Sequence, residues 1–392
     1  MMPDARTEDQ ILICIARRSL DDATAVRLLA LVRRDIDWEY LIGKARRHCL
    51  IPLLYHHVNS VCREAVPLQA MAQLREENQE NTQSNLFLTA ELLKILDLLA
   101  ANGIQAIPFK GPTLALSAYG DVGLRQFGDL DILVHKQDVP AVRKLLVDRG
   151  FEPKFKLTAV QEAALLRYDY VYDFGRTEPT RLWVEIHWGI VARYFCFDFD
   201  FARVWDRLES ITIGGQQLPT LSPEDLLLIL CVHGSRHLWN RLAWISDIAS
   251  LIELRKDINW QRVISDAAAL GSERMLLLGL FLAGKLLAAP IPEEVWKTVQ
   301  ADPAVQSLAD LVERRLFLEP DASPGVFEKG LLHLRMKERK RDRVKSCVRL
   351  VATSTVYDWM FLPLPDWLFF LYYPLRPFRL AGKYGAGLLK GS

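Results

Sequence analysis

Apolar residues recur at helical spacing through the N-terminal part of the chain. In 8–34, 38–58 and 68–101 they stand three or four positions apart, which is the pattern of amphipathic helices. Beyond residue 102 short apolar runs are separated by glycines and single polar residues, which is typical of strands and turns. Helical spacing returns at Leu226. The pattern therefore predicts an α/β segment between two helical ones.

The middle segment alternates strand-like and helical runs. Residues 104–109, 129–134, 168–172 and 181–188 are short and rich in β-forming or alternating apolar residues, whereas 139–149 has the spacing of an amphipathic helix. Alternation of this kind predicts a small mixed sheet, not a full doubly wound one. The expected fold class is α/β (α+β), with a mixed-sheet core flanked by N- and C-terminal helical segments.

These changes of pattern divide the chain into three predicted domains. Residues 1–102 form an N-terminal helical segment, 103–220 an α/β core, and 221–392 a C-terminal helical domain with a basic and aromatic tail. Gly214-Gly215 between two strand-like runs predicts a hairpin near the end of the core. Ser222, followed by proline and acidic residues, predicts the start of the first helix in the third domain.

The candidate chemistry is concentrated in 104–134. Lys110 and Gly111 form a predicted turn between a strand and a short helix, whose N-terminus can receive a phosphate. Asp129 and Asp131 stand two positions apart in a strand-like run, so their side chains point to one face about 6.5 Å apart. Like charges held that close need a cation, and Mg²⁺ favours carboxylate and phosphate oxygens. The alternative is a solvated strand end whose acids bind no metal.

A third carboxylate lies in 181–188, where Trp183, Glu185 and His187 alternate with apolar residues. This alternation predicts a strand with an acid on one face. If this strand and the one that carries the aspartate pair are neighbours, Glu185 lies beside the pair. The alternative is an ordinary polar residue on the exposed face of a strand.

The order of these features resembles the core of the DNA polymerase β-like nucleotidyltransferase superfamily. The sequence is closer still to the bacterial uncharacterised nucleotidyltransferase family, which is often associated with biosynthetic gene clusters for polysaccharides or peptide natural products. The resemblance covers residues 105–254. The matching positions are Lys110-Gly111, Tyr119, Arg125, Asp129-Leu-Asp131, 138–151, Glu185-Ile-His-Trp188 and 233–247.

The resemblance implies a nucleotide site in this segment. Asp129 and Asp131 would bind Mg²⁺, Glu185 would complete the carboxylate set, and the phosphates of an NTP would lie over the turn at Lys110 and Gly111. The implied activity is Mg²⁺-dependent transfer of an NMP from an NTP such as ATP to an acceptor, with release of pyrophosphate. The acceptor would be a small molecule, a sugar or a peptide.

The turn departs from the pattern that is usual in the superfamily. Gly-Ser or Gly-Gly and a shorter spacer are usual there, whereas here Gly111 is followed by Pro112 and a longer loop leads to Asp129. Proline has no N–H to offer a phosphate, so the phosphate contact is expected from Lys110 and Arg125. The alternative is a binding or scaffold protein on a transferase fold that has lost catalysis.

Two further features lie in the third domain. His233 and His237 have the i, i+4 spacing of metal ligands, but the glutamate of the H-E-x-x-H motif is missing. The expectation is that His233, Arg236 or His237 lines the acceptor side or packs, with a zinc hydrolase as the alternative. Asp247 is the candidate general base for an acceptor hydroxyl, unless Ser246 and Asp247 cap a helix.

The resemblance implies an NTP and an acceptor as partners, and composition adds no other. The formal net charge is +1, so a nucleic acid partner is not expected. The six cysteines show no C-x-x-C spacing, which argues against a disulfide framework and favours a reducing, cytoplasmic setting. The opening residues are polar and acidic, so a signal peptide is not expected.

The tail joins a basic run to an aromatic segment. Residues 335–345 read RMKERKRDRVK, and 359–373 are rich in Trp, Phe and Tyr. A basic segment followed by an aromatic one can lie on an anionic membrane surface, here the inner surface of the cell membrane. Pro363, Pro365 and Asp366 argue against a membrane span. The default expectation is that the tail folds back onto the helices, and peripheral membrane contact is the alternative.

Overall fold

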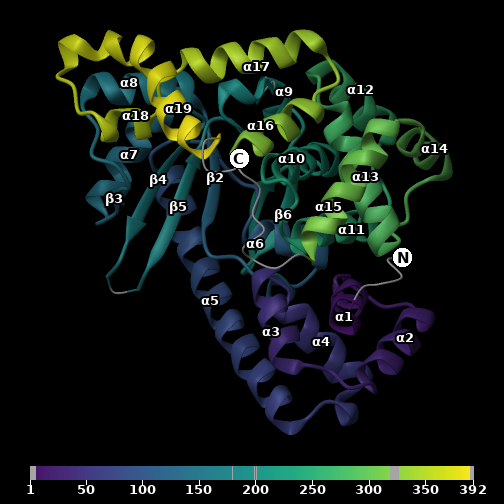
Figure 1. The fold of residues 1–392 in the computed structure, drawn as a ribbon. Helices are drawn as coiled ribbons and strands as arrows, with labels where there is room; N and C mark the ends of the chain where they lie inside the picture. Colours follow the sequence, from purple (N-terminus) through teal and green to yellow (C-terminus); the bar gives the residue numbers. More distant parts are fainter. Residues whose placement is uncertain (1–5, 179, 198, 200, 318–325, 389–392) are drawn as a thin grey trace.

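The computed structural model describes residues 6–178, 180–197, 199, 201–317 and 326–388. Five strands form a mixed sheet in the order β1-β2-β5-β4-β3, in which β2 and β5 run parallel and the other neighbours antiparallel. Strands β6 and β7 form a hairpin. The strands are β1 (Ala106–Pro108), β2 (Leu130–Val134), β3 (Glu152–Pro153), β4 (Val171–Arg176), β5 (Leu182–His187), β6 (Glu209–Ile213) and β7 (Gln216–Thr220). The expected mixed sheet and hairpin are confirmed (Figure 1).

The two faces of the five-stranded sheet have different partners. Leu130 and Ile132 of β2 and Val184 and Ile186 of β5 share one apolar cluster with three covering helices. These helices are α5 (Leu68–Ala101), α7 (Val139–Asp148) and α8 (Ala159–Tyr168). Because successive strand residues alternate between faces, Leu133 points the other way and joins a second cluster. The acidic residues of β2 and β5 lie on this second face.

Helices from both ends of the chain share the second apolar cluster. The N-terminal ones are α1 (Thr7–Ile15), α2 (Asp22–Val32), α3 (Trp38–Arg47) and α4 (Ile51–Val61). The later ones are α9 (Phe201–Trp205), α10 (Pro223–Arg236), α11 (Leu242–Leu254), α12 (Trp260–Leu270), α13 (Glu273–Leu287), α14 (Glu293–Ala301), α15 (Pro303–Leu316) and α16 (Val326–Arg335). Three more helices follow, which are α17 (Lys340–Ala352), α18 (Val356–Phe361) and α19 (Tyr372–Leu388), and α18 and α19 contribute to the first cluster. The helical character expected for both ends is confirmed, while the division into three domains stays a prediction.

Two local expectations are corrected by the structure. Tyr168 ends α8 and Tyr170 precedes β4, so of the three alternating tyrosines Tyr172 alone lies in the strand. Ser246 and Asp247 lie inside α11 and not at its start, so they do not cap it. None of the helices in the described part of the chain combines the length and the apolar content that crossing a bilayer takes.

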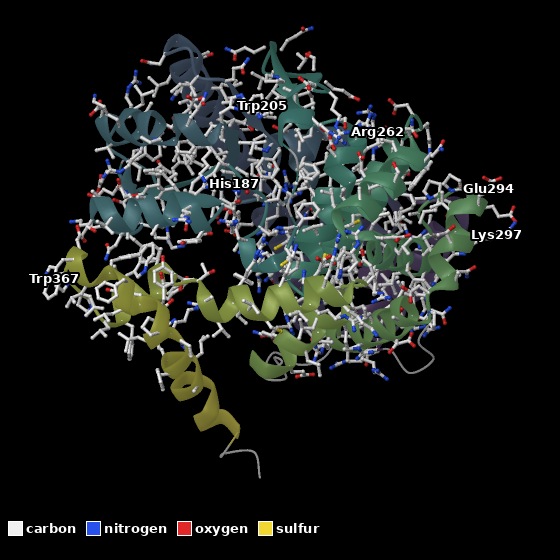
Figure 2. The ribbon with its side chains drawn as sticks, turned by 90° about the horizontal axis from the view of Figure 1, so that it is seen from above. His187, Trp205, Arg262, Glu294, Lys297 and Trp367 are labelled. Carbon is white, nitrogen blue, oxygen red and sulfur yellow. The ribbon has the colours of Figure 1, made fainter. Side chains whose placement is uncertain are left out.

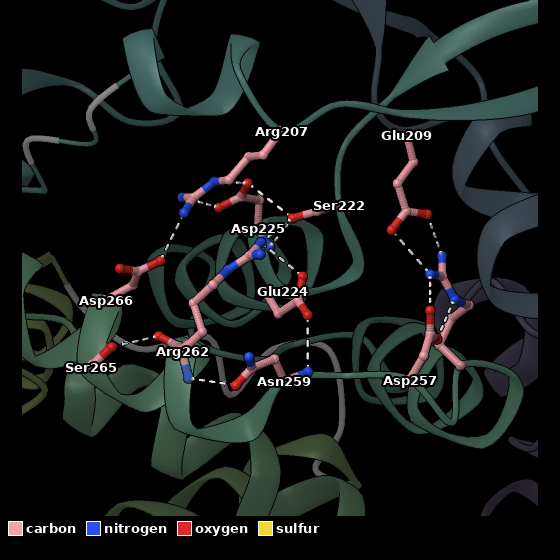
Figure 3. Close-up of polar contacts among 11 residues, drawn as sticks. Arg207, Glu209, Ser222, Glu224, Asp225, Asp257, Asn259, Arg262, Ser265 and Asp266 are labelled. Carbon is pink, nitrogen blue, oxygen red and sulfur yellow. Dashed lines mark hydrogen bonds and ion pairs between the residues drawn. The ribbon is translucent and has the colours of Figure 1, made fainter.

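Polar side chains hold the start of α10 against the hairpin and α12. Arg207 donates to both carboxylate oxygens of Asp225 at 2.6 and 2.7 Å, and Arg262 donates to Glu224 at 2.8 Å (Figure 3). Ser222 caps the helix as expected, because its hydroxyl oxygen accepts from the Asp225 N–H at 3.3 Å. Asp225 is buried, and a buried carboxylate needs such partners. These pairs fix where α10 begins.

A close approach of glycine and tryptophan fixes where α10 ends. The Trp239 N–H donates to the Gly234 carbonyl at 2.9 Å, so the chain folds back directly after the helix. The Trp239 indole is completely buried, and a Cβ on Gly234 would lie 2.4 Å from it. The last turn of α10 carries His233 and Arg236. Its position therefore depends on the absence of a side chain at Gly234.

We expect Gly234→Ala to lower the free energy of unfolding by about 1–3 kcal/mol, because the added methyl overlaps a ring that cannot leave the core. Urea denaturation followed by circular dichroism measures this loss. Gly43→Ala in α3 is the matched control, since a Cβ there meets nothing within 4 Å and should be neutral or add up to about 1 kcal/mol. Equal effects of the two substitutions would contradict the assignment.

Candidate active site

β2 and β5 bring two of the predicted carboxylates side by side. In their parallel pairing Asp131 lies directly opposite Glu185, and Leu133 lies opposite His187. Residues i and i+2 of a strand share a face, so His187 lies on the same face as both acids. The two strands are therefore neighbours, which was the condition for Glu185 to lie near the aspartate pair. Ligand atoms of Asp131, Glu185 and His187 all lie within 4.8 Å of one another.

Lys110 and His187 both contact one oxygen of Asp131. Lys110 Nζ donates to Asp131 Oδ1 at 2.9 Å, and His187 Nε2 lies 3.1 Å from that oxygen and 3.3 Å from Glu185 Oε2. Asp131 and His187 are 4% and 2% exposed (Figure 2 labels His187). Burial alone would lower the pKa of His187, but its bonds to the two carboxylates outweigh burial and raise it. His187 is therefore favoured as an imidazolium that donates from Nε2.

Three carboxylates face two cations in this cluster. Burial would raise the pKa of Asp131, but Lys110 and His187 hold it well below its usual range. Burial also acts against ionisation of Glu185, yet the bond to His187 leaves its pKa lowered. At Asp129, directly before β2, burial and then the charges of Asp131 and Glu185 raise the pKa to about 6. Of the three carboxyl groups, Asp129 is therefore the one whose ionised form its surroundings disfavour.

The turn at Lys110 and Gly111 lies against β2. The Phe109 N–H donates to the Asp131 carbonyl at 3.3 Å, so β1 delivers Lys110 to the side of the acid. Gly111 has φ +55°, and a Cβ on it would lie 3.3 Å from the carbonyl oxygen of Asp129. Glycine adopts this backbone angle without strain and leaves room for the approach. The sequence-predicted turn residues are thus brought to the aspartate pair.

Arg125 and Asp247, two further predicted site residues, pair with each other. Arg125 Nε and Nη2 donate to the two oxygens of Asp247 at 2.9 and 3.1 Å. The hydroxyl of Tyr119 donates to Asp247 Oδ1 at 2.9 Å. Tyr119 ends the helical segment expected after the turn, which consists of α6 (Pro112–Leu114) and a π-helical turn over 115–119. The three side chains tie this segment and the loop before β2 to α11.

The geometry favours a structural role for the Arg125–Asp247 pair. Asp247 is 1% exposed and accepts bonds at both oxygens, which leaves its carboxylate enclosed. Burial opposes the charge of Arg125, but Asp247 outweighs it and raises the pKa of the guanidinium further. Arg125 still acts on the cluster, because its charge lowers the pKa of Asp129. The phosphate contact of Arg125 and the general-base role of Asp247 stay predictions.

The last turns of α10 face the cluster with two imidazoles. The rings of His233 and His237 lie 4.6 Å apart and both contact Trp244. Burial and then the charge of Lys110 lower the pKa of His233, and burial and then Arg236 lower that of His237 to about 3. Within the described residues, the group of three possible metal ligands that the structure contains excludes both histidines. This argues against the zinc hydrolase.

Sequence reasoning did not assign a role to His187. The signal was present, because His187 follows Glu185 by two positions in an alternating strand and therefore shares its face. Only the strand pairing reveals that Asp131 also lies within reach of the imidazole. Nδ1 of His187 is buried without a hydrogen-bond partner, so Nε2 makes the hydrogen bonds of the ring, and Phe109 contacts the ring edge-to-face at 5.1 Å between centroids.

Asp169 is a half-buried acid at the junction of α8 and β4. Burial raises its pKa to about 6, against the effect of the Tyr170 N–H that donates to Oδ1 at 3.0 Å. The guanidinium of Arg236 also lowers the pKa, and it lies 4.9 Å from the centre of the Tyr170 ring. Asp169 therefore belongs to the layer between the sheet and α10.

Arg125→Met should lower the free energy of unfolding by about 3–5 kcal/mol, because it leaves Asp247 buried as an unpaired charge. Chemical denaturation at neutral pH measures the loss. The control is Lys144→Met, which breaks an exposed i, i+4 pair with Asp148 and should change stability by less than about 1 kcal/mol. If Arg125→Met lowers the unfolding free energy no more than Lys144→Met does, the structural role of the Arg125–Asp247 pair is contradicted.

Asp169→Asn should stabilise the protein at pH 8 and lose this advantage towards pH 4. The folded-state pKa of about 6 lies above the unfolded value, so the wild-type carboxyl contributes most at low pH and loses that contribution as the pH rises through about 6. The expected gain at pH 8 is about 1–2 kcal/mol. Unfolding free energies from pH 4 to pH 8 measure it, and a pH-independent difference would contradict the assignment. Asp148→Asn, on an exposed acid, is the control.

Comparison with known proteins agrees with the predicted family. None of the curated proteins matches the chain. The crystal structure of an antigenic nucleotidyltransferase-like protein from Paracoccidioides brasiliensis is similar at 19% identity and a TM-score of 0.30, over 54% of this chain and 96% of that one. A family described as uncharacterised nucleotidyltransferase matches residues 34–288, which is more than half of the chain. The protein therefore belongs to the uncharacterised nucleotidyltransferase family.

Proposed function

We propose that the protein transfers an NMP from an NTP to an acceptor and releases pyrophosphate, with Mg²⁺ held by Asp129, Asp131 and Glu185. The observation that carries the proposal is the β2–β5 register, because it places Asp131 opposite Glu185. Lys110 donates a hydrogen bond to Oδ1 of the same Asp131. Membership of a nucleotidyltransferase family supports the reaction class. The acceptor is proposed to be a small molecule, a sugar or a peptide, in a cytoplasmic setting.

The donor set fits a hard divalent cation. Asp131 and Glu185 belong to the group whose ligand atoms lie within 4.8 Å of one another, and Asp129 would add the third carboxylate. Carboxylates are the ligands that Mg²⁺ prefers. Burial, and then the charges of Asp131 and Glu185, raise the pKa of Asp129 and so disfavour its ionised form, and a bound dication would favour that form again. When bound, Mg²⁺ would supply positive charge to the phosphate oxygens of the NTP.

The residues around the carboxylates would position and shield them. His187 bonds to Asp131 and Glu185 together, so it holds both carboxylates in one orientation. Lys110 provides the cation nearest to Asp131, next to the turn over which the phosphates are proposed to lie. Burial and the charge of Lys110 lower the pKa of His233, so this imidazole would meet the acceptor in its neutral form.

A second candidate is a binding or scaffold protein on the same fold. Three features favour it: Lys110 is engaged by Asp131, Arg125 is engaged by Asp247, and Pro112 has no N–H for a phosphate. Such a protein would bind a nucleotide weakly and without need of Mg²⁺. The two candidates therefore differ in a property that can be measured without knowing the acceptor.

Thermal and urea unfolding with each of the four NTPs, with and without Mg²⁺, tests the proposal. An NTP at a hundred times its dissociation constant should add about 2.7 kcal/mol to the unfolding free energy if it binds the folded state alone. We expect this gain for the wild type only with Mg²⁺. Asp129→Asn and Glu185→Gln should abolish it, whereas Asp148→Asn on an exposed helix should retain it.

Asp131 is not replaced in this experiment, because Lys110 and His187 would then lose the oxygen that both of them contact. If none of the NTPs stabilises the wild type, or if the gain is the same without Mg²⁺ and in Asp129→Asn, the transferase proposal is wrong. The second outcome would favour the scaffold.

A further inference from the structure

The side of α17 that faces the rest of the molecule is polar. Asp342 is buried there, Ser346 donates to the Tyr194 carbonyl, and Arg349 Nη1 donates to the Arg193 carbonyl at 2.9 Å. These three positions are spaced i, i+4 and i+7, so they form one stripe along the helix. The helix is thus attached to the body through hydrogen bonds.

The opposite side of α17 is apolar and exposed. Val344, Val348 and Val351 stand two positions after the inward residues, which places them on the far side of a helix that turns 100° per residue. They are 64%, 59% and 42% exposed. A surface helix ordinarily buries its apolar stripe and exposes its polar one. In α17 this arrangement is reversed.

The apolar surface continues over the rest of the C-terminal layer, by which we mean α17, α18, α19 and the 3₁₀ helix η7 (Asp366–Leu371). Twelve of the eighteen large apolar side chains exposed in the described part of the chain lie between residues 344 and 378. The exposed aromatic ones are Tyr357 (64%), Phe361 (71%), Trp367 (75%), Phe370 (61%) and Phe378 (75%). Such a concentration marks an interaction surface.

The layer is anchored to the body, so its exposure belongs to the fold. Thr158 on the edge of α8 donates to Asp366 at 2.6 Å, and the hydroxyls of Tyr373 and Tyr168 lie 3.2 Å apart. Arg376 bonds to the buried Asp358 inside the layer. Figure 1 shows α17, α18 and α19 together along one side of the molecule, and Figure 2 shows Trp367 at its outer edge.

Positive charge accompanies the apolar surface. Residues 339–379 hold eight Arg and Lys against three Asp, whereas the whole chain has a net charge of only +1. Lys340, Arg341 and Lys345 are exposed on α17 and flank its valine stripe. Asp342 and Asp358 are buried, and so is Arg376, which pairs with Asp358, so neither these two acids nor this arginine contributes charge at the surface.

We propose that the C-terminal layer docks on the surface of an anionic phospholipid membrane. Valine and aromatic side chains would enter the boundary between headgroups and acyl chains, and the flanking Lys and Arg would meet the lipid phosphates. Trp and Tyr favour this boundary because each joins an apolar ring to a polar group. The proposal is independent of the nucleotidyltransferase reaction.

The charge of the C-terminal layer argues against a second copy of the chain as its binding partner. In a two-fold dimer the same patch meets itself, so Lys340, Arg341 and Lys345 would face like charges across the contact. An anionic membrane offers the opposite charge to the same residues and an apolar interior to the valines and aromatics. One surface thus satisfies both properties of the layer.

Cosedimentation of the full chain with vesicles tests the proposal. We expect binding to phosphatidylcholine vesicles with about 30 mol% phosphatidylserine to be at least about tenfold tighter than to phosphatidylcholine alone, and to weaken in about 0.5 M salt. Two triple variants, Phe361→Ser with Trp367→Ser and Phe370→Ser, and Lys340→Glu with Arg341→Glu and Lys345→Glu, should each weaken it by about tenfold or more.

The matched control is Leu68→Ser with Lys297→Glu, which removes an apolar side chain that is 90% exposed and a basic one that is 70% exposed elsewhere on the surface. Figure 2 shows Lys297 on the side opposite Trp367. The control should bind like the wild type. All changed side chains are strongly exposed, so unchanged circular dichroism and melting should accompany each variant.

Trp367 provides a second readout that does not depend on affinity. Brominated phosphatidylcholine in anionic vesicles should quench part of the tryptophan fluorescence, and Trp367→Phe should bind as before but lose that part. Binding that is absent, equal for neutral and anionic vesicles, or unaffected by both triple variants overturns the proposal. So does a wild-type dimer that the variants convert to a monomer, since the layer would then join two copies.

Discussion

The charge balance at Asp131 is the constraint on which the arrangement of the site depends. This carboxylate is buried, and both Lys110 and His187 contact one of its oxygens. A buried carboxylate without partners destabilises a fold by several kcal/mol, so the turn after β1 and the strand β5 must both reach β2 at this point. Glu185 shares His187 with Asp131, whereas burial and these two acids disfavour the ionised form of Asp129. The same balance thus stabilises the sheet and gathers the carboxylates at the proposed cation site.

A second buried ion pair connects this site to the helices. Arg125 and Asp247 join the loop before β2 to α11, and Tyr119 adds the helical segment that follows the turn. Asn85 of α5 donates to the carbonyls of Val122 and Arg125 at 2.7 and 2.8 Å, so the same loop is held from the N-terminal side. The loop that leads to the aspartate pair therefore takes its position from helices on both sides of the core. Core and helices act as one unit in placing the carboxylates.

In the C-terminal layer, too, buried polar groups are paired, but here the exposed surface is apolar. Buried polar groups must find partners, and Asp358 with Arg376 and the inward side of α17 do so inside the protein. These polar contacts lie beside Val356, Trp359 and Tyr372, which are buried in the first apolar cluster, whereas the valines of α17 and five other aromatic side chains stay exposed. This surface is the proposed membrane contact, and the carboxylate cluster is the proposed cation site.

The sequence by itself determined the local elements and the acid pair. Helical and alternating periods located the helical ends, the mixed sheet and the hairpin, because periodicity reflects which side of an element is buried. The Lys110-Gly111 turn and the Ser222 helix start were also readable, since they depend on residue type within a few positions. Only the tertiary structure decided the partners of Asp131 and Arg125. His187 lies 56 residues from Asp131 along the chain, and Asp247 lies 122 residues from Arg125. The periodicity of one helix or strand does not show which distant charged residue it will contact.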